Sequence, residues 1–238
     1  KIDMSEFAES FNISKLIGAP AGYVGYKEGT KLTDAIRNRP YSVVLFDEIE
    51  KAHRQIFNLL LQILEEGYLT DGSGKKINFK NSIIIMTSNL GSENFNKQAA
   101  LGFDSQDDDK RIEAEKSFSQ TEAGVLKELK DKFPPEFLSR IDKTIVFKPL
   151  TKNGVNKITK LQLEELKKRL ALQELEVNIQ PGVYKLIAQA SYSPVTGARE
   201  IRKNIQELIE GKIAQKILSS KKKSRKITVK AKGNEIIL

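Results

Sequence analysis

Two acidic residues directly follow a short apolar run near the start of the chain. Residues 43–46 read Val-Val-Leu-Phe, and Asp47 and Glu48 come next. Such a run predicts a buried strand whose carboxyl end presents both carboxylates at the edge of a sheet. In nucleotide hydrolases an Asp at this place helps hold Mg²⁺, and a neighbouring Glu can orient and polarise the attacking water. An acidic helix start is the alternative, because the helix dipole also favours it.

A second polar tip follows another apolar run. Residues 83–86 read Ile-Ile-Ile-Met, and Thr87, Ser88 and Asn89 follow them. If both runs are parallel strands, the two tips lie at the same sheet edge, where Asn89 can donate to a phosphate or hold a water. A simple strand-ending turn is the alternative, since Ser and Asn favour turns.

Two arginines are placed where they could reach a phosphate. Arg140 lies in a surface turn, where it could act on a neighbouring subunit's nucleotide. The alternative is an ordinary salt bridge to Asp142 or Glu136. Arg199 follows Gly197-Ala198 in the first turn of a predicted helix, and it could reach across a domain cleft. A solvated helix start is the alternative there.

The segment Gly22-Tyr23-Val24-Gly25 places an aromatic and a β-branched residue between two glycines. Glycines give such a loop a wide choice of backbone angles, so it can present an apolar tip that grips a partner chain. The alternative is a turn whose tyrosine packs inward.

The elements that must position these residues are strands and helices in alternation. Residues 43–46 and 83–86 predict strands buried on both faces of a parallel sheet, and Thr144–Phe147 predicts a third. Between the first two, Gln55–Glu66 carries an apolar stripe at helical spacing, which makes a crossover unit. Gly72-Ser73-Gly74 predicts a turn at a hairpin or loop tip.

The rest of the chain changes character twice. Residues 102–122 are polar and predict a mobile loop, and Pro134-Pro135 ends a helix over 123–132. We place a domain boundary near 149, giving a large α/β domain over 1–149 and a small, mostly helical domain over 150–238. The predicted elements of the small domain are helices over Val155–Leu172, from Pro181 to about Ala190 and over Gly197–Leu218, a strand at Val177–Ile179, and a hairpin of Ile227–Ala231 with Glu235–Leu238.

Composition and charge exclude several classes of function. The 238 residues include one His and no Cys, which excludes disulfides, thiolate zinc sites and multi-histidine metal sites. The longest apolar runs are too short to span a membrane. The net charge is +9, and residues 211–234 hold nine basic residues and no acidic one. No aromatic residue interleaves that run, so we interpret it as a solvated helix end and a charged edge strand rather than a nucleic-acid site.

Taken together, these motifs resemble the AAA+ Clp unfoldases, specifically the second ATPase domain of the ClpC/ClpA/ClpB group, with ClpC most similar. The resemblance runs nearly end to end. It is carried by Ile2-Asp3-Met4-Ser5-Glu6, Leu16-Ile17-Gly18-Ala19-Pro20, Gly22–Tyr26, Arg39–Val44, Asp47–His53, Met86–Asn89, Pro135–Asp142 and Gly197–Arg199.

The resemblance implies an α/β AAA+ large domain with a parallel sheet, a small helical lid domain with a short sheet, and ATP with Mg²⁺ between them. It implies roles for the residues singled out above. Asp47 and Glu48 would be the Walker B pair, with Asp47 as the indirect Mg²⁺ ligand. Asn89 would be sensor 1, Arg140 an arginine finger that acts in trans, and Arg199 sensor 2. Tyr23 and Val24 would belong to the pore loop that contacts the substrate. We interpret His53, which follows the Walker B pair, as structural.

One expected motif is missing. No Gly-x-x-x-x-Gly-Lys-Ser/Thr phosphate loop occurs, since the Gly-Lys pairs at 74–75 and 211–212 are not followed by Ser or Thr. In the family this loop lies upstream of Ile2. The chain also opens on Lys1, without Met or a signal peptide. We therefore expect a piece that has lost its first strand and phosphate loop, or a degenerate or split gene, and expect residues 1–238 to bind ATP weakly and not to hydrolyse it.

Three functions remain open. The first is part of a homo-hexameric, ATP-driven unfoldase that takes unfolded substrates and adaptors and threads the substrate into a ClpP-type protease, in bacterial cytoplasm or plastid stroma. The second is a ClpB-like disaggregase, and the third is a non-catalytic oligomerisation or regulatory module. Leu101-Gly102-Phe103 favours the first, because protease-partnered Clp ATPases carry a similar tripeptide that would dock on the protease. We expect no nucleic-acid or membrane partner.

Overall fold

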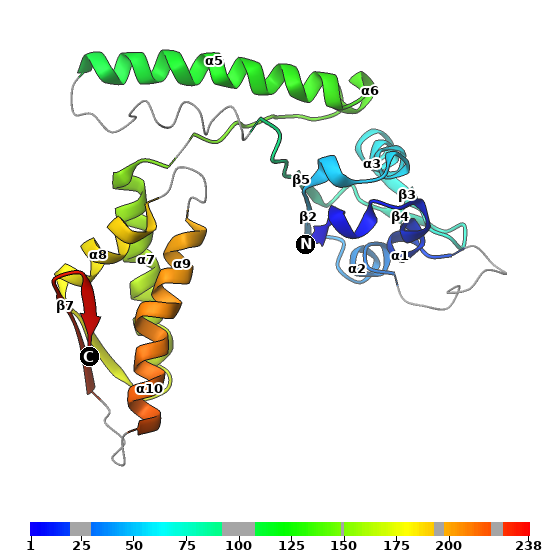
Figure 1. The fold of residues 1–238 in the computed structure, drawn as a ribbon. Helices are drawn as coiled ribbons and strands as arrows, with labels where there is room; N and C mark the ends of the chain where they lie inside the picture. Colours follow the sequence, from blue (N-terminus) through cyan, green and yellow to red (C-terminus); the bar gives the residue numbers. More distant parts are fainter. Residues whose placement is uncertain (20–29, 92–107, 149, 193–197, 220–225) are drawn as a thin grey trace. The chain divides into compact units, whose positions relative to one another are not determined.

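The computed structural model describes residues 1–19, 30–91, 108–148, 150–192, 198–219 and 226–238. It is α/β, as expected, with a parallel sheet in its first part and helices around a small sheet in its last part (Figure 1). The chain divides into two compact units. These are Lys1–Ser92 with Glu122–Val146, and Glu93–Thr121 with Phe147–Leu238.

The first unit is built on a parallel sheet of three strands in the order β1-β2-β5. Val43 of β2 aligns with Ile83 of β5, and this register continues to the pair Phe46 and Met86. The crossover between β2 and β5 contains helix α3, as the alternating pattern predicted. The elements of this unit are β1 (Ile2–Asp3), η1 (Met4–Phe7), η2 (Ser10–Ile13), α1 (Ser14–Ile17), α2 (Thr33–Asn38), β2 (Val43–Asp47), η3 (Ile49–Lys51), α3 (Arg54–Glu66), β3 (Tyr68–Thr70), β4 (Lys76–Asn78), β5 (Ile83–Met86), α6 (Pro135–Leu138) and the last part of α5 (Asp108–Lys132).

The sheet is covered on one face. Val44 and Phe46 are 7% and 1% exposed and lie in the core of the unit. The alternate residues Val43, Ile83 and Ile85 are 60%, 62% and 44% exposed. The prediction of strands buried on both faces was therefore wrong for the described residues. An apolar run favours burial, but a face of the sheet is buried only where another element packs on it.

Helix α3 forms where its apolar stripe predicts it. Ile56, Leu60 and Ile63 are buried against the sheet core, as the helical spacing requires. The His53 ring caps the first turn, since its Nδ1 accepts a hydrogen bond from Gln55 N–H at 3.3 Å. Gly67 ends the helix at φ 70°, a left-handed angle that suits glycine. The structural role expected for His53 agrees with this cap.

Two expectations about the middle of the chain were wrong. Helix α5 begins at Asp108, whereas we expected a mobile loop to 122. Its sequence over 108–122 contains no Gly or Pro and is rich in helix formers, with acidic residues at its start, where the helix dipole favours them. The strand expected at Thr144–Phe147 is irregular chain without a sheet partner among the described residues, and Ile145 and Phe147 are 64% and 85% exposed.

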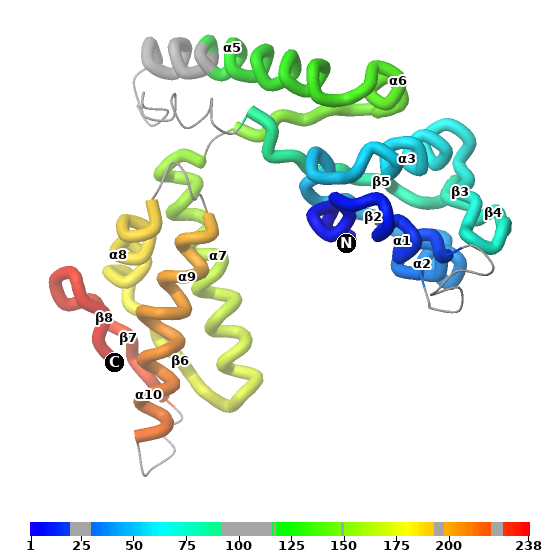
Figure 2. The backbone as a smooth tube through the Cα atoms, turned by 45° about the vertical axis from the view of Figure 1, so that its right-hand side comes forward, coloured from blue at the N-terminus to red at the C-terminus, as the bar shows by residue number. Residues whose placement is uncertain are grey.

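The second unit packs helices around a sheet of three strands in the order β6-β7-β8, as Figure 2 shows. Strands β6 and β7 are parallel, and β7 and β8 form the predicted hairpin around Gly233-Asn234. In α7, Leu163 and Leu166 are buried, whereas Leu161 is 64% exposed and lies on the solvent side of the helix. The elements are α7 (Lys152–Ala171), β6 (Glu176–Ile179), α8 (Pro181–Ser191), α9 (Arg199–Ile205), η4 (Gln206–Glu210), α10 (Gly211–Ser219), β7 (Lys226–Lys232), β8 (Glu235–Ile237) and the first part of α5.

The long helix predicted near 197–218 contains a π-helical turn, η4, between α9 and α10. Ile201, Ile205, Ile209 and Ile213 are all buried at a constant spacing of four residues. In an α-helix of 3.6 residues per turn this spacing would carry the last isoleucine off the buried face. The wider π turn compensates the drift and keeps all four side chains in the core.

The basic run near the end of the chain is also placed differently. β7 is the central strand of its sheet and not the edge strand we expected, because β6 and β8 pair on its two sides. Lys226 forms an ion pair with Glu176 at 2.9 Å, and Lys212 Nζ donates to the Ile236 carbonyl at 2.5 Å.

Within the described ranges, no helix is long and apolar enough to cross a membrane.

Candidate functional site

The two polar tips meet at the carboxyl edge of the parallel sheet. Phe46 pairs with Met86, so the residues that follow, Asp47 and Thr87, stand side by side. Glu48 and Asn89 come next, and Asn89 Nδ2 donates to Glu48 Oε1 at 3.2 Å. The edge therefore brings together the two acidic residues and the asparagine that the sequence predicted.

Thr87 holds the acidic pair in place. Its hydroxyl donates to Asp47 Oδ1 and accepts a hydrogen bond from Glu48 N–H at 3.2 Å. Its carbonyl accepts from Ile49 N–H at 2.9 Å. Sequence reasoning gave this threonine no role, although counting both parallel strands from their paired starts places it opposite Asp47. One side chain therefore fixes both the carboxylate of Asp47 and the backbone of Glu48.

Glu48 has an unusual backbone conformation. Its φ and ψ are 57° and 50°, in the left-handed region that residues other than glycine rarely adopt. The carboxylate accepts from Asn89 and forms an ion pair with Lys51 Nζ at 2.5 Å. The hydrogen bond from Lys51 to this carboxylate raises the pKa of the Lys51 ammonium. Neighbouring contacts thus hold Glu48 in a strained position at the sheet edge, which is where functional residues are often found.

Glu50 supports the asparagine from a third side. Its Oε1 accepts from the backbone N–H of Asn89 at 3.2 Å. Its other oxygen, Oε2, is buried and has no hydrogen-bond partner among the described residues. Glu50 therefore fixes the turn that carries Asn89, and it keeps one buried acceptor available for a donor from elsewhere.

The donor atoms around Asp47 suit a hard cation. The Asp47 carboxylate is 28% exposed at the side-chain level, and its Oδ2 lies 2.6 Å from Lys1 Nζ. The hydrogen bond from Lys1 to Asp47 raises the pKa of the Lys1 ammonium, so this carboxylate already accommodates a positive charge. In the part of the chain that the structure describes, no cluster of three or more His, Cys, Asp or Glu side chains could hold a metal. A single carboxylate is nevertheless what Mg²⁺ uses when waters and substrate phosphates supply its other ligands.

The two candidate arginines belong to different units. Arg140 of the first unit forms an ion pair with Glu65 at 2.6 Å, so its partner is neither Asp142 nor Glu136, which the alternative interpretation expected. Both side chains of this pair are about half exposed, at 47% and 54%, and an exposed pair of this kind is worth only about 0–1 kcal/mol. Arg199 of the second unit is exposed in the first turn of α9, as predicted.

Two predicted binding segments lie outside the described residues. These are Tyr23 and Val24 of the glycine-flanked loop, and the tripeptide Leu101-Gly102-Phe103. Their roles stay predictions.

Comparisons with known proteins identify the family of the chain. Residues 1–144 match the model of the AAA domain family (Cdc48 subfamily), and residues 150–231 match the C-terminal, D2-small domain of ClpB protein. A chloroplastic chaperone protein ClpC1 of Arabidopsis thaliana is 46% identical over 242 residues, covering all of this chain and 26% of its own. A chaperone protein ClpB of Prochlorococcus marinus is 48% identical over 225 residues, covering 94% and 24%.

A solved structure is similar as well. The S. cerevisiae Hsp104:casein complex in its extended conformation matches 96% of this chain and 37% of its own, with 37% sequence identity and a TM-score of 0.81. The chain spans about a quarter of the length of the curated relatives ClpC1 and ClpB. Members of the family are ATP hydrolases. The match over 1–144, followed by the D2-small match, shows that this chain belongs to the AAA domain family (Cdc48 subfamily) and, within it, to the Clp/Hsp100 unfoldases, where it corresponds to the D2 region.

Proposed function

We propose that the complete protein is an ATP-driven protein unfoldase that threads polypeptide through the pore of a homo-hexamer into a ClpP-type protease. The observation that carries the proposal is the contact of Glu48 with Asn89 beside Asp47, at the carboxyl edge of β2 and β5. This is the edge at which parallel sheets bind nucleotides. The family assignment supports the same chemistry.

The residues of this edge divide the work of hydrolysis. Asp47 would hold Mg²⁺, which neutralises charge on the ATP phosphates when bound. Glu48 orients a water and accepts its proton, and Asn89 keeps the Glu48 carboxylate directed at that position through its amide. Thr87 fixes Asp47 and the backbone of Glu48, so neither group needs to reorganise during the reaction.

We propose that Arg140 acts on the nucleotide of a neighbouring subunit and that Arg199 acts on the nucleotide of its own. The exposed pair of Arg140 with Glu65 costs little to break, which leaves the guanidinium free to change partner. An arginine can contact two phosphate oxygens at once, and this suits the developing charge of the transition state. The role of Arg140 requires the assembled ring, and the role of Arg199 requires the division into large domain 1–149 and small domain 150–238 that we expect.

We propose that Tyr23 and Val24 grip the substrate and that adaptors deliver it. The chain would work in a bacterial cytoplasm or a plastid stroma, since its relatives include a chloroplastic ClpC1 and a bacterial ClpB. The similar yeast structure is a complex of Hsp104 with casein, which supports polypeptide as the substrate class.

A ClpB-like disaggregase is the second candidate. It is favoured by the 48% identity to the cyanobacterial ClpB and by the likeness to Hsp104. The tripeptide Leu101-Gly102-Phe103 favours the protease-partnered function instead. A regulatory module without catalysis is a third candidate, because residues 1–238 contain no phosphate loop.

The test of hydrolysis is Glu48→Gln in the complete protein. Loss of the carboxylate base should slow hydrolysis by about 10²–10⁴-fold while ATP binding persists, because glutamine keeps the shape and cannot accept the proton. Steady-state ATPase and calorimetric ATP binding measure the two effects. Turnover at the parent rate would rule out Glu48 as the base. A complete protein that neither binds nor hydrolyses ATP would support the regulatory module.

A further inference from the structure

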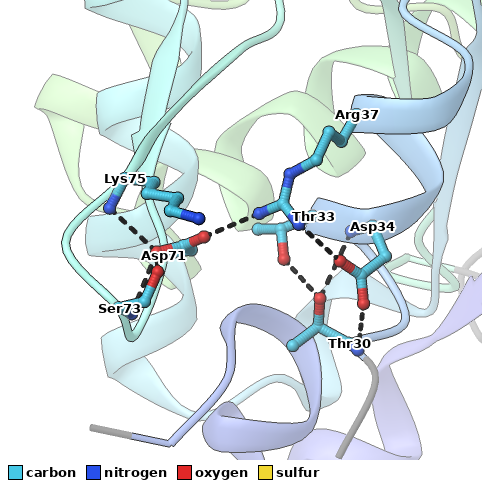
Figure 3. A network of polar contacts seen from close by, with 7 residues as sticks. All are labelled: Thr30, Thr33, Asp34, Arg37, Asp71, Ser73 and Lys75. Carbon is cyan, nitrogen blue, oxygen red and sulfur yellow. Dashed lines mark hydrogen bonds and ion pairs between the residues drawn. The ribbon is translucent and has the colours of Figure 1, made fainter. Parts of the chain in front are cut away.

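The two described ends of segment 20–29, which carries Tyr23, are both attached to the tip of the β3–β4 hairpin. The segment leaves the described chain after Ala19 and re-enters it at Thr30. The hairpin tip, Asp71–Lys75, lies between the two strands and contacts one end by backbone packing and the other through side chains. Figure 3 shows the side-chain network.

The first end rests directly on Gly72. The Gly72 N–H donates to the Ile17 carbonyl at 2.8 Å. A Cβ at position 72 would lie 2.4 Å from the Gly18 carbonyl oxygen and 3.0 Å from the Ala19 carbonyl carbon. Only glycine permits this approach, because a Cβ at this position would overlap the Gly18 carbonyl group. The absence of a side chain thus lets the hairpin tip touch the chain just before residue 20.

The second end is held through helix α2. Asp34 Oδ2 accepts from Thr30 N–H at 2.7 Å, and the hydroxyls of Thr30 and Thr33 share a hydrogen bond. Arg37 then bridges two carboxylates, with Nη1 3.0 Å from Asp34 Oδ1 and Nη2 2.8 Å from Asp71 Oδ2 (Figure 3). A continuous chain of contacts therefore runs from Thr30 to the hairpin.

The hairpin end of this chain is rigid. Asp71 Oδ1 accepts from Ser73 N–H at 2.9 Å, from the Ser73 hydroxyl at 2.7 Å and from Lys75 N–H at 2.9 Å. The side chain is only 7% exposed. With three hydrogen bonds on one oxygen and an arginine on the other, Asp71 has no freedom to follow Arg37, so Arg37 and α2 must follow Asp71.

We propose that Asp71 and Gly72 are positioning residues that fix the backbone of Ile17–Ala19 and of Thr30, and that the grip proposed for Tyr23 depends on these two ends being held. The inference rests on the proposed function, because it assigns the grip to Tyr23. The Arg37 side chain is 46% exposed, whereas the Asp71 side chain that it contacts is only 7% exposed, so Arg37 ties α2 to a buried and hydrogen-bonded carboxylate.

The decisive variant is Gly72→Ala in the full-length assembled protein. Ordinary contact distance for the new methyl requires the hairpin and Gly18 to move apart by about 1 Å. We expect unfolding of a folded fluorescent protein with an unstructured tail to slow by about tenfold or more, since misplacement of a working group by about 1 Å has effects of this order or larger. Basal ATPase without substrate should stay within about twofold of the parent. Hydrogen exchange over 15–19 and 30–34 should accelerate.

Two further variants separate position from stability. Gly124→Ala is the matched control, because its Cβ meets nothing within 4 Å in α5, and it should leave both rates unchanged. Asp71→Asn keeps an oxygen for Ser73 and Lys75 and removes the charge that Arg37 contacts, so it should slow unfolding in the same direction by a smaller factor. Lys76→Gln, an exposed cation on the same hairpin, is the control for charge.

Each outcome supports or overturns the inference. Parent-rate unfolding by Gly72→Ala overturns it, and so does a parallel fall of basal ATPase and thermal stability, which indicates a merely structural role. Unchanged exchange and unfolding in Asp71→Asn also contradict it. Tyr23→Ala distinguishes the proposals. If it threads substrate like the parent, the proposed grip fails, whereas if it fails to thread while Gly72→Ala works normally, only the hairpin inference is wrong.

Discussion

The left-handed backbone of Glu48 gives a quantitative prediction about two substitutions at one position. Glu48→Gly and Glu48→Ala both remove the 2.5 Å contact with Lys51 and the 3.2 Å hydrogen bond from Asn89. The stability difference between them therefore isolates the backbone. A residue with a Cβ costs about 1–2 kcal/mol in this conformation, and glycine escapes that cost.

Glycine also loses more chain entropy on folding than alanine does, by about 0.5–1 kcal/mol. The net expectation is that the Glu48→Gly variant is more stable than the Glu48→Ala variant by up to about 1.5 kcal/mol. In a chain of 238 residues, each kcal/mol of difference in stability shifts the melting temperature by roughly 2–4 °C. Urea unfolding followed by circular dichroism, together with thermal melts, measures the difference.

A sign control is available in α5. Glu128 lies in the interior of that helix, where glycine should be less stable than alanine by about 1 kcal/mol. The order of glycine and alanine should therefore reverse between positions 48 and 128. If alanine is at least as stable as glycine at both positions, Glu48 is not held in a left-handed conformation and the strain argument for this site is refuted.

Three further predictions concern other parts of the chain. Thr87→Val should lower kcat for ATP by about tenfold in the complete protein with little change in KM, Thr87→Ser should restore it, and equal kinetics of all three would remove the positioning role. The hydrogen bond from Tyr184 lowers the pKa of the Glu164 carboxyl, so the pair stabilises the fold above the pKa of the unfolded carboxyl, and this stability is lost as pH falls through the folded pKa. Tyr184→Phe should therefore weaken the acid-side pH dependence of the unfolding free energy. An unchanged pH dependence would contradict the role of the pair. Phe103→Ala in the assembled ATPase should leave hydrolysis and unfolding intact while ClpP-dependent degradation fails, whereas surviving degradation, or a joint collapse of assembly and ATPase, would favour the disaggregase.

Local signals predicted several helices and hairpins correctly, although not the first part of α5. The apolar stripe of α3, Pro181 at the start of α8 and Gly233-Asn234 in the last hairpin act over a few residues, and the structure has each element where the sequence places it. These signals are reliable because the interactions behind them are contained within one turn or one hairpin.

Expectations that depended on a distant partner failed. The runs at 43–46, 83–86 and 144–147 are all apolar enough to predict strands, yet the first two pair in a sheet and the third has no described partner. The hydrophobicity of a segment indicates only that its side chains favour burial. The element that covers them, or the strand that pairs with the segment, lies elsewhere in the chain. The same limit explains Arg140, whose partner Glu65 lies 75 residues away rather than in its own turn.

The candidate site shows how far residue patterns reach. Two acidic residues after one strand and an asparagine after the next were sufficient to predict that the two polar tips share one sheet edge, because parallel strands end at a common edge. The structure adds that Glu48 and Asn89 are in contact there. The pattern did not contain the left-handed turn at Glu48, since glutamate has no preference for that conformation. Only the tertiary contacts of Thr87 with Glu48 and Ile49, which join residues some forty positions apart, make it visible.

That mismatch is itself informative about the site. An amino acid sequence that satisfied every local rule would place Gly or Asn at position 48, where the backbone turns left-handed. The chain has a glutamate there, and it is held by one hydroxyl contact on its backbone, one amide and one ammonium on its carboxylate. A glutamate that stands against its backbone preference, with its carboxylate at the carboxyl edge of the parallel sheet, is better explained by a requirement for that carboxylate than by the fold. The reversal between positions 48 and 128 tests the strain on which this argument depends.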